Sequence, residues 1–294
     1  MTSIHPTAIV DPAAKLGDGV EIGPYAIVGP GVTLGAGTVV QAHAVVAPEA
    51  RLGADVRIGP YAVIGPHVEL GDRCEIQAHA VVDGDTTLGP DCQVFPFAHV
   101  GGKTQDLKFR EGNRTFVKVG ARTVLRECVT INCGTKDGES TIVGDDCLIM
   151  AYCHLAHGVV FGSHVIVSNA TQFAGEVTVG DWAVISGLVG VHQFVRIGAH
   201  AMIGGASVIK QDAAPYFITD GAPASCCGVN VVGLGRRGFA KETIEALRAA
   251  YKLLCHSGLN VTAALERISA ELPDLPEIRA LADFYRSSQR GVIR

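Results

Sequence analysis

The chain has 294 residues, 48% of them hydrophobic, with 36 glycines and few aromatic residues, which suits a solenoid of tight corners better than a sandwich or a helical bundle. Its mild net charge of −5 argues against a nucleic-acid-binding protein. No apolar run is long enough for a membrane span and no signal peptide is evident, so we expect no stable membrane insertion. Nine scattered cysteines without a C-x-x-C pair predict thiols in a reducing compartment, which favours the cytoplasm.

An aliphatic or aromatic position that returns every six residues dominates the chain. It starts at Ile4, keeps its step to Val100, and runs again from Val143 to Ile209. Neither a period-2 strand nor a 3.6-residue helix keeps such a step for so long. Three hexapeptides make about one turn of a triangular parallel β-helix, so residues about 18 apart stack, about 4.8 Å from coil to coil. We therefore predict a parallel β-helix over residues 1–217, left-handed as in known hexapeptide proteins.

The repeat is interrupted twice before it ends. The polar, charged segment at about 101–116 is expected to leave the β-helix as a loop, and loops inserted into solenoids often carry function. A shorter excursion follows at 134–141. Pro215 and the segment 220–223 end the pattern, and residues 218–294 predict a small helical domain with helices over 241–254, 260–271 and 276–288. From residue 196 onward the chain carries 12 Lys and Arg against 9 Asp and Glu, which fits an acidic partner as well as a solvated surface.

Two histidines, His154 and His157, lie in the middle of the second run. In the predicted stack His157 lies under Gly175, and Gly175 under Gln193, so the imidazole faces a gap through which a substrate could enter. An imidazole titrates near neutral pH and can take a proton from an alcohol, which makes His157 a candidate general base. A histidine paired with solvent at a solenoid corner is the alternative. His154 and His192 suggest a metal site only weakly, because no third ligand has convincing spacing.

Several charged residues fit either substrate binding or an ordinary surface. Asp106 and Lys108 lie in the predicted inserted loop, where charges are common. The adjacent Arg236 and Arg237 suit a diphosphate, because guanidinium groups bind phosphate oxygens in pairs. Each of these signals is weak by itself.

Together, several short motifs resemble those of one enzyme family. They are Gln105-Asp106-Leu107-Lys108, Arg126-Glu127-Cys128-Val129-Thr130-Ile131, His154-Leu155-Ala156-His157, Val191-His192-Gln193-Phe194, and Gly228-Val229-Asn230 followed by Arg236-Arg237-Gly238-Phe239. Over nearly its whole length the chain resembles the acyl-carrier-protein-dependent UDP-N-acetylglucosamine O-acyltransferases, which carry out the first step of lipid A biosynthesis. The resemblance implies a cytoplasmic homotrimer that transfers a 3-hydroxyacyl chain from acyl carrier protein to the 3-hydroxyl of UDP-N-acetylglucosamine. The carrier thioester is then the co-substrate, and neither a metal nor an organic cofactor is needed.

The same resemblance implies roles for single residues. His157 matches the general base, and the backbone N–H of Gly175 matches the donor to the thioester oxyanion. Gly205 matches the position that sets the depth of the acyl groove, and a glycine there leaves the groove long. The other matches are contacts to the sugar, from Asp106, Lys108 and His154, and contacts to the nucleotide and phosphates, from Gln193, Asn230, Arg236 and Arg237.

Four positions depart from the family pattern. Gly158 replaces an acidic residue directly after the base, Glu176 replaces a histidine one coil above, Asn132 replaces a histidine, and Val232 replaces a glutamate beside the nucleotide. Because Glu176 stacks over Gly158, we predict that it orients His157 as the acid of a His–acid pair does.

Two alternatives for Glu176 stay open at this point. It could attract the ammonium group of a 3-amino sugar nucleotide, which would make the protein an N-acyltransferase, or it could be an ordinary solvated side chain. Outside this enzyme class, the rivals are a non-catalytic hexapeptide scaffold and a carbonic-anhydrase-like zinc protein.

Overall fold

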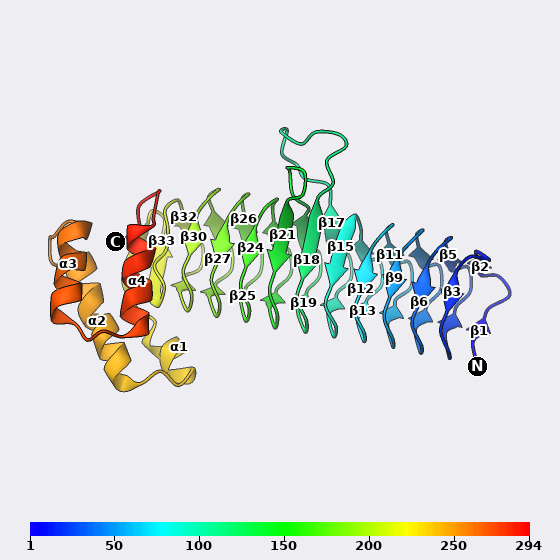
Figure 1. The fold of residues 1–294 in the computed structure, drawn as a ribbon, viewed down its shortest axis with the longest axis horizontal. Helices are drawn as coiled ribbons and strands as arrows, with labels where there is room; N and C mark the ends of the chain where they lie inside the picture. The colour runs from blue at the N-terminus through cyan, green and yellow to red at the C-terminus, as the bar shows by residue number, and fades with distance from the viewer.

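The six-residue step returns in the computed structural model, which describes residues 1–294, as short strands whose second side chain points inward. In the strand formed by Arg57 and Ile58, for example, the arginine is exposed and the isoleucine is buried. Strands of successive coils pair in parallel, with Ile4 opposite Ile22 and Leu155 opposite Phe173. The coils make one elongated solenoid, and the C-terminal helices lie together at one end of it (Figure 1). The predicted parallel β-helix and its stacking interval are therefore confirmed.

The strands form three sheets, one for each side of the solenoid. Sheet A has 13 strands: β1 (Ser3–Ile4), β4 (Glu21–Ile22), β7 (Val39–Val40), β10 (Arg57–Ile58), β13 (Glu75–Ile76), β16 (Gln93–Val94), β19 (Val124–Leu125), β22 (Leu148–Ile149), β25 (Ile166–Val167), β28 (Val184–Ile185), β31 (Met202–Ile203), β33 (Phe217–Gly221) and β34 (Ala224–Val229). Sheet B has 11: β2 (Ile9–Val10), β5 (Ile27–Val28), β8 (Val45–Val46), β11 (Val63–Ile64), β14 (Val81–Val82), β17 (His99–Gly102), β20 (Thr130–Asn132), β23 (His154–Leu155), β26 (Gln172–Phe173), β29 (Gly190–Val191) and β32 (Val208–Ile209). Sheet C has 10: β3 (Lys15–Leu16), β6 (Thr33–Leu34), β9 (Arg51–Leu52), β12 (Glu69–Leu70), β15 (Asp85–Leu88), β18 (Phe116–Val119), β21 (Ser140–Val143), β24 (Val160–Phe161), β27 (Thr178–Val179) and β30 (Arg196–Ile197).

The interior of the solenoid is one continuous apolar column. It contains 55 buried residues, mostly Val, Ile, Leu and Ala, and burying such a side chain stabilises the fold by about 1.5–3 kcal/mol. At the corners, many non-glycine residues adopt left-handed backbone angles, such as Tyr25 and His43 with φ of 58° and 60°. Their rings stack with centroids 5.0 Å apart, and such aromatic pairs contribute about 0.5–1.5 kcal/mol beyond their area. Stacking along the corners thus offsets part of the cost of the left-handed conformation.

Both interruptions of the repeat leave the solenoid at the corner between sheets B and C. The first lies between β17, which ends at Gly102, and β18, which begins at Phe116; the second lies between β20 and β21. Register is recovered each time, because Val100 pairs with Ile131 and Ile131 with Leu155. Figure 1 shows the two loops on the same side of the solenoid.

The chain ends in a hairpin and four helices. The hairpin of β33 and β34 and the short helix α1 (Val231–Arg236) were not predicted from the sequence. The helices α2 (Lys241–Cys255), α3 (Val261–Glu271) and α4 (Pro276–Arg286) confirm the three predicted ones, although α4 ends at Arg286 rather than near Ser288. The helices and the end of the solenoid share a second buried cluster of 18 residues. The division into two domains at residue 217 stays a prediction. No helix is both long and apolar enough to cross a bilayer, and all nine cysteines are free thiols.

A buried ion pair ties α4 to the last coils. Arg196 Nε lies 2.9 Å from the Asp212 carboxylate, which is 2% exposed. The same guanidinium donates to the Phe284 carbonyl at 2.8 Å and to the Ser287 hydroxyl at 3.1 Å, and it lies over the Phe284 ring. Arg196 therefore holds both the solenoid and the helix.

We expect Arg196→Ala to lower the free energy of unfolding by about 3 kcal/mol, because it leaves the buried Asp212 carboxylate without its cation. A urea titration followed by circular dichroism measures the change. Arg51→Ala is the matched control, since Arg51 has the same outward position on sheet C but is 70% exposed in its pair with Glu69. That variant should lose less than about 1 kcal/mol. Equal losses in the two variants would show that Arg196 does not hold the helix.

Candidate active site

The two inserted loops pack on each other at the corner between sheets B and C. The hydroxyl groups of Thr104 and Thr135 lie 3.1 Å apart, and the Asn113 amide donates to the Thr135 carbonyl at 3.0 Å. These contacts join the two inserted segments, 103–115 and 133–139, into one wall. This wall stands beside the coils that carry His157.

The wall and sheet B enclose a pocket of about 620 Å³. Of the predicted site residues, the structure brings six together in its lining: Asp106, Lys108, His154, His157, Gly175 and Gln193. Three further polar residues, for which no role was predicted, also line the pocket: Gln105, Gln172 and Lys210. Asn132 and His192, singled out in the sequence on other grounds, line it as well. Gln172 could have been found by counting one coil onward from His154, and Lys210 by counting one coil onward from His192, whereas Gln105 lies on a loop outside the repeat.

His157 sits under Gly175, as the stacking interval predicts. A methyl group on Gly175 would lie 2.3 Å from both Cε1 and Nε2 of the imidazole. The expected gap above the histidine is therefore filled by the histidine ring itself, and the entry of substrate beside it stays a prediction. Glycine is needed at position 175 because the ring occupies the space of a side chain.

The imidazole of His157 presents one nitrogen to the pocket and buries the other. Its Nε2 lies 3.4 Å from the Asp106 carboxylate, and the two side chains are only 12% and 18% exposed. Its Nδ1 is buried and has no hydrogen-bond partner. Nearby, His154 Nδ1 lies 2.7 Å from the Thr130 hydroxyl, and burial lowers the pKa of His154, so this ring is neutral at pH 7. The site thus offers a largely buried imidazole whose Nε2 can accept a proton from a hydroxyl group.

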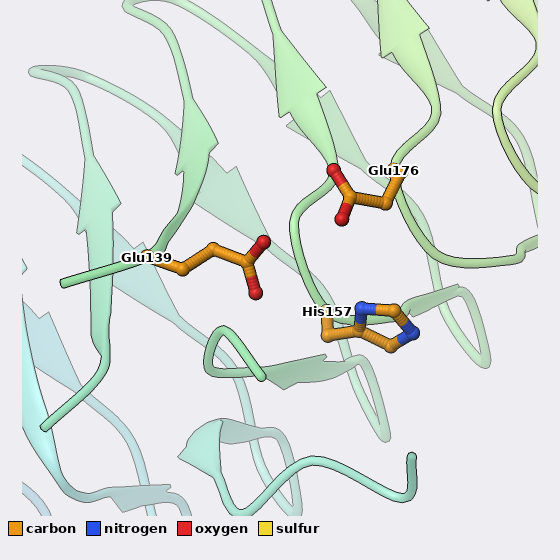
Figure 2. Close-up of side chains that lie close together, drawn as sticks. All are labelled: Glu139, His157 and Glu176. Carbon is orange, nitrogen blue, oxygen red and sulfur yellow. The ribbon is translucent and has the colours of Figure 1, made fainter. Parts of the chain in front are cut away.

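Two carboxylates face the buried side of the ring. Figure 2 shows Glu139 and Glu176 pointing toward the ring nitrogen nearer to the backbone, and one donor atom from each of the three residues lies within 4.8 Å of the others. Lys136 Nζ lies 3.3 Å from Glu176 and 3.7 Å from Glu139, so an ammonium group offsets one of the two negative charges of this cluster. Neither His154 nor His192 belongs to the cluster.

The residues expected to bind the nucleotide lie elsewhere in the chain. Asn230 caps α1 by accepting from Gly233 N at 3.1 Å, and it donates to the His200 carbonyl at 2.9 Å. Arg237 lies over the Trp182 ring, 5.3 Å from its centroid, at the corner between sheets C and A. Burial, with the charge of Arg237 adding to it, lowers the pKa of His200 to about 4, so that neighbouring ring is neutral and does not repel the arginine.

Arg236, Gly205 and Val232 do not line the pocket either. Arg236 is the last residue of α1. Gly205 is exposed at the corner between sheets A and B, where a Cβ would meet nothing closer than the Gly187 carbonyl at 3.6 Å. The space expected at position 205 is therefore present, although its role stays a prediction. Val232, in the first turn of α1, is 65% exposed.

Comparison with known proteins identifies relatives over most of the chain. A family model described as UDP N-acetylglucosamine O-acyltransferase, domain 2, matches residues 212–293, and a bacterial transferase hexapeptide model matches 2–48 and 49–84. The acyl-[acyl-carrier-protein]–UDP-N-acetylglucosamine O-acyltransferase of Burkholderia thailandensis is 45% identical over 203 residues, which cover 66% of this chain and 76% of that protein. The chain belongs to this O-acyltransferase family.

Solved structures of this O-acyltransferase family agree with that assignment. A UDP-N-acetylglucosamine acyltransferase from Bacteroides fragilis superimposes with a TM-score of 0.71 at 36% identity, covering 99% of this chain and 100% of that one. The enzyme from Arabidopsis gives a TM-score of 0.78 at 33% identity, covering 99% and 100%. The expected fold, a left-handed parallel β-helix with a few C-terminal helices, is confirmed, and so is the expected class, an acyltransferase.

We expect Gly175→Ala to lower kcat by about tenfold or more, because the new methyl group must push the His157 ring away from the pocket, and small displacements of reacting groups are costly. Initial rates of acyl transfer by the folded protein measure the effect. Gly59→Ala is the control, since its methyl group would lie 2.8 Å from the Ala78 backbone N in a coil far from the site. It should lower stability while the folded enzyme keeps its rate. A normal rate for Gly175→Ala would contradict the placement of the ring.

Proposed function

We propose that the protein transfers a 3-hydroxyacyl chain from acyl carrier protein to the 3-hydroxyl of UDP-N-acetylglucosamine, in lipid A biosynthesis. The single observation that carries this proposal is His157, whose Nε2 faces a pocket walled by the inserted loop. The names of the relatives supply the two substrates. The acyl carrier brings the activated thioester, so the reaction needs no further cofactor, and we place it in the cytoplasm.

In this mechanism His157 Nε2 takes the proton of the sugar hydroxyl, whose oxygen attacks the thioester carbonyl. Supporting this assignment, the backbone N–H of Gly175 lies beside the imidazole and donates to no group within the chain. A free N–H at that point can stabilise the oxyanion. Asp106, Lys108, His154 and Gln193, which share the pocket, are proposed as contacts to the sugar and its phosphates.

Glu176 is proposed to support the base rather than to read the acceptor. It lies on the Nδ1 side of the ring and pairs with Lys136; it does not line the pocket of about 620 Å³, but lines a smaller one of about 390 Å³ with Asp106 and Lys108. The N-acyltransferase and scaffold alternatives therefore have less support than O-acylation.

We propose that the site is completed by a second copy within a homotrimer. Asn230, Arg236 and Arg237, expected at the nucleotide, lie away from the His157 pocket of their own chain. The outer face of sheet A supports an interface, because on its C-terminal coils it presents five apolar residues in a row: Val124, Leu148, Ile166, Val184 and Met202. A partner that covers this face would bring the nucleotide residues to the neighbouring pocket.

The acyl chain and its carrier are assigned to the surfaces that continue from the pocket. Gly190 and Val208 lie on sheet B beyond His157, and Gly205 stands at the next corner with room above it, so we propose that the chain runs this way. We propose that acyl carrier protein is the acidic partner of this region. Helix α2 exposes three basic residues that could bind it: Lys241, Arg248 and Lys252.

We expect His157→Ala to lower turnover about 100-fold or more, the usual scale for loss of a general base. Mass spectrometry of the product formed from 3-hydroxyacyl carrier protein and UDP-N-acetylglucosamine measures it. Circular dichroism of the variant checks that it is folded. Near-normal product formation by the folded variant would exclude His157 as the base, and absence of O-acylated sugar with the wild-type protein would exclude the proposed function.

The only tryptophan, Trp182, reports on the proposed nucleotide site because Arg237 lies on its ring. We expect UDP to change its fluorescence, and Arg237→Ala to weaken UDP binding about tenfold or more, as for loss of a charged hydrogen bond. Arg248→Ala, an exposed arginine paired with Glu245, is the matched control and should bind UDP normally. Equal UDP affinity in the two variants would remove Arg237 from the site.

A further inference from the structure

The Nδ1 atom of His157 is buried and unpartnered, and two carboxylates lie beside it. Nδ1 has no hydrogen-bond partner, although Glu139 and Glu176 each bring an oxygen into the same cluster within 4.8 Å (Figure 2). We propose that Glu139, contributed by the second inserted loop, is a positioning residue for His157 that acts together with Glu176. The proposal rests on the proposed role of His157 as the base, and it adds a residue to which no role had been given.

Glu139 is held as a fixed negative charge. Its carboxylate accepts from the backbone N–H groups of Thr135 and Lys136, and its side chain is 15% exposed. Burial acts to raise the pKa of Glu139, but these two backbone donors and Lys136 outweigh it and hold the pKa below its usual value. The group is therefore ionised at neutral pH. The position of this charge is therefore determined by the backbone turn of the second inserted loop, and not by the regular coils of the solenoid.

Glu176 is the more exposed of the two carboxylates. It stands at a left-handed corner with φ of 60°, and its backbone N–H donates to the His157 carbonyl at 2.9 Å. Its side chain is 28% exposed and pairs with Lys136, whose own side chain is 76% exposed. Lys136 lets two carboxylates lie close together, because it lies within 4 Å of both.

Gly158 leaves room for this arrangement. A Cβ at this position would lie 3.1 Å from the Glu176 carboxylate and 3.5 Å from Glu139 Oε1. The space directly after the base is thus filled by side chains from two other parts of the chain. Aspartate is compatible with the backbone here, since Asp91 and Asp146 adopt φ of 60° and 55° at other corners while Gly158 has φ of 67°.

Two carboxylates on this side have a defined effect on the reaction. They favour the tautomer with its proton on Nδ1, which leaves the Nε2 lone pair free for the hydroxyl proton. As the O–H bond breaks and the C–O bond forms, Nε2 becomes protonated, and the carboxylates stabilise the imidazolium. When the C–S bond breaks, Nε2 returns this proton to the carrier thiolate, and the imidazole is neutral again.

The charge balance around His157 determines the sign of the expected pH effect. The charged groups that share a pocket or cluster with it are Asp106, Lys108, Arg110, Lys136, Asp137, Glu139, Glu176 and Lys210, with His192 and the neutral His154 beside them. Removing a carboxylate disfavours the imidazolium, so the ring stays neutral and active to lower pH. Removing Lys136 does the opposite.

The experiment is the pH dependence of kcat for Glu139→Gln and Lys136→Met. Glutamine keeps an acceptor for the two backbone donors, so the loop is preserved while the charge is lost. We expect kcat to fall about tenfold, with the acidic limb of the profile moving down by about one pH unit. Lys136→Met changes an exposed side chain and should move the acidic limb upward. Adding Gly158→Asp to Glu139→Gln should restore part of kcat, because a carboxylate returns to the Nδ1 side.

Glu49→Gln is the matched control. In an N-terminal coil, Glu49 occupies the corner position that Glu176 occupies beside His157, with φ of 62°. Its side chain lies over Gly31, as that of Glu176 lies over Gly158. Its profile should equal that of the wild type. If the acidic limb stays in place in both Glu139→Gln and Lys136→Met while His157→Ala is inactive, the proposal for Glu139 is overturned and the proposed function stands. An active His157→Ala would overturn the base assignment and this proposal together.

Discussion

Parallel stacking of coils is the constraint on which the rest of the molecule depends. Each strand pairs only with strands one coil above and below, as Leu155 pairs with Ile131 and Phe173. A shift by one residue would turn the buried column outward. The chain can therefore add residues only where it leaves at a corner and returns in register. Both insertions do so at the corner between sheets B and C, and this is why the site lies there.

Much of the fold and part of the site follow from this regularity. The column of His157, Gly175 and Gln193 could be read from the sequence because each residue occupies the same place in its coil. The α2–α4 helices could be predicted from apolar periodicity and from signals such as Asn260, whose side chain accepts from Ala263 N at 2.8 Å. The orientation of the imidazole could not, since the space over Gly175 is taken by a ring whose direction depends on packing.

What the sequence could not provide lies outside the repeat. Glu139 reaches His157 through a loop whose path is determined by hydrogen bonds such as that of Asn113 to the Thr135 carbonyl, and no periodicity describes such contacts. The hairpin of β33 and β34 and the short helix α1 depend on burial against the end of the solenoid. Arg237, at the end of α1, lies on Trp182, at a corner of the solenoid. The separation of these two residues in the sequence does not predict this contact.

The same corner architecture explains how one chain can separate its base from its nucleotide residues. His157 lies at the corner between sheets B and C, whereas Arg237, which we propose binds the nucleotide, lies over Trp182 at the corner between sheets C and A. Mobile loops could bridge the distance in a globular enzyme, but the coils here are pinned above and below. The proposed second copy, docked side against side, would bring the two corners together without breaking a coil. A rigid repeat therefore makes assembly the simplest route to a complete site, and it leaves fine adjustment of the base to the inserted loops, which alone are free of the register.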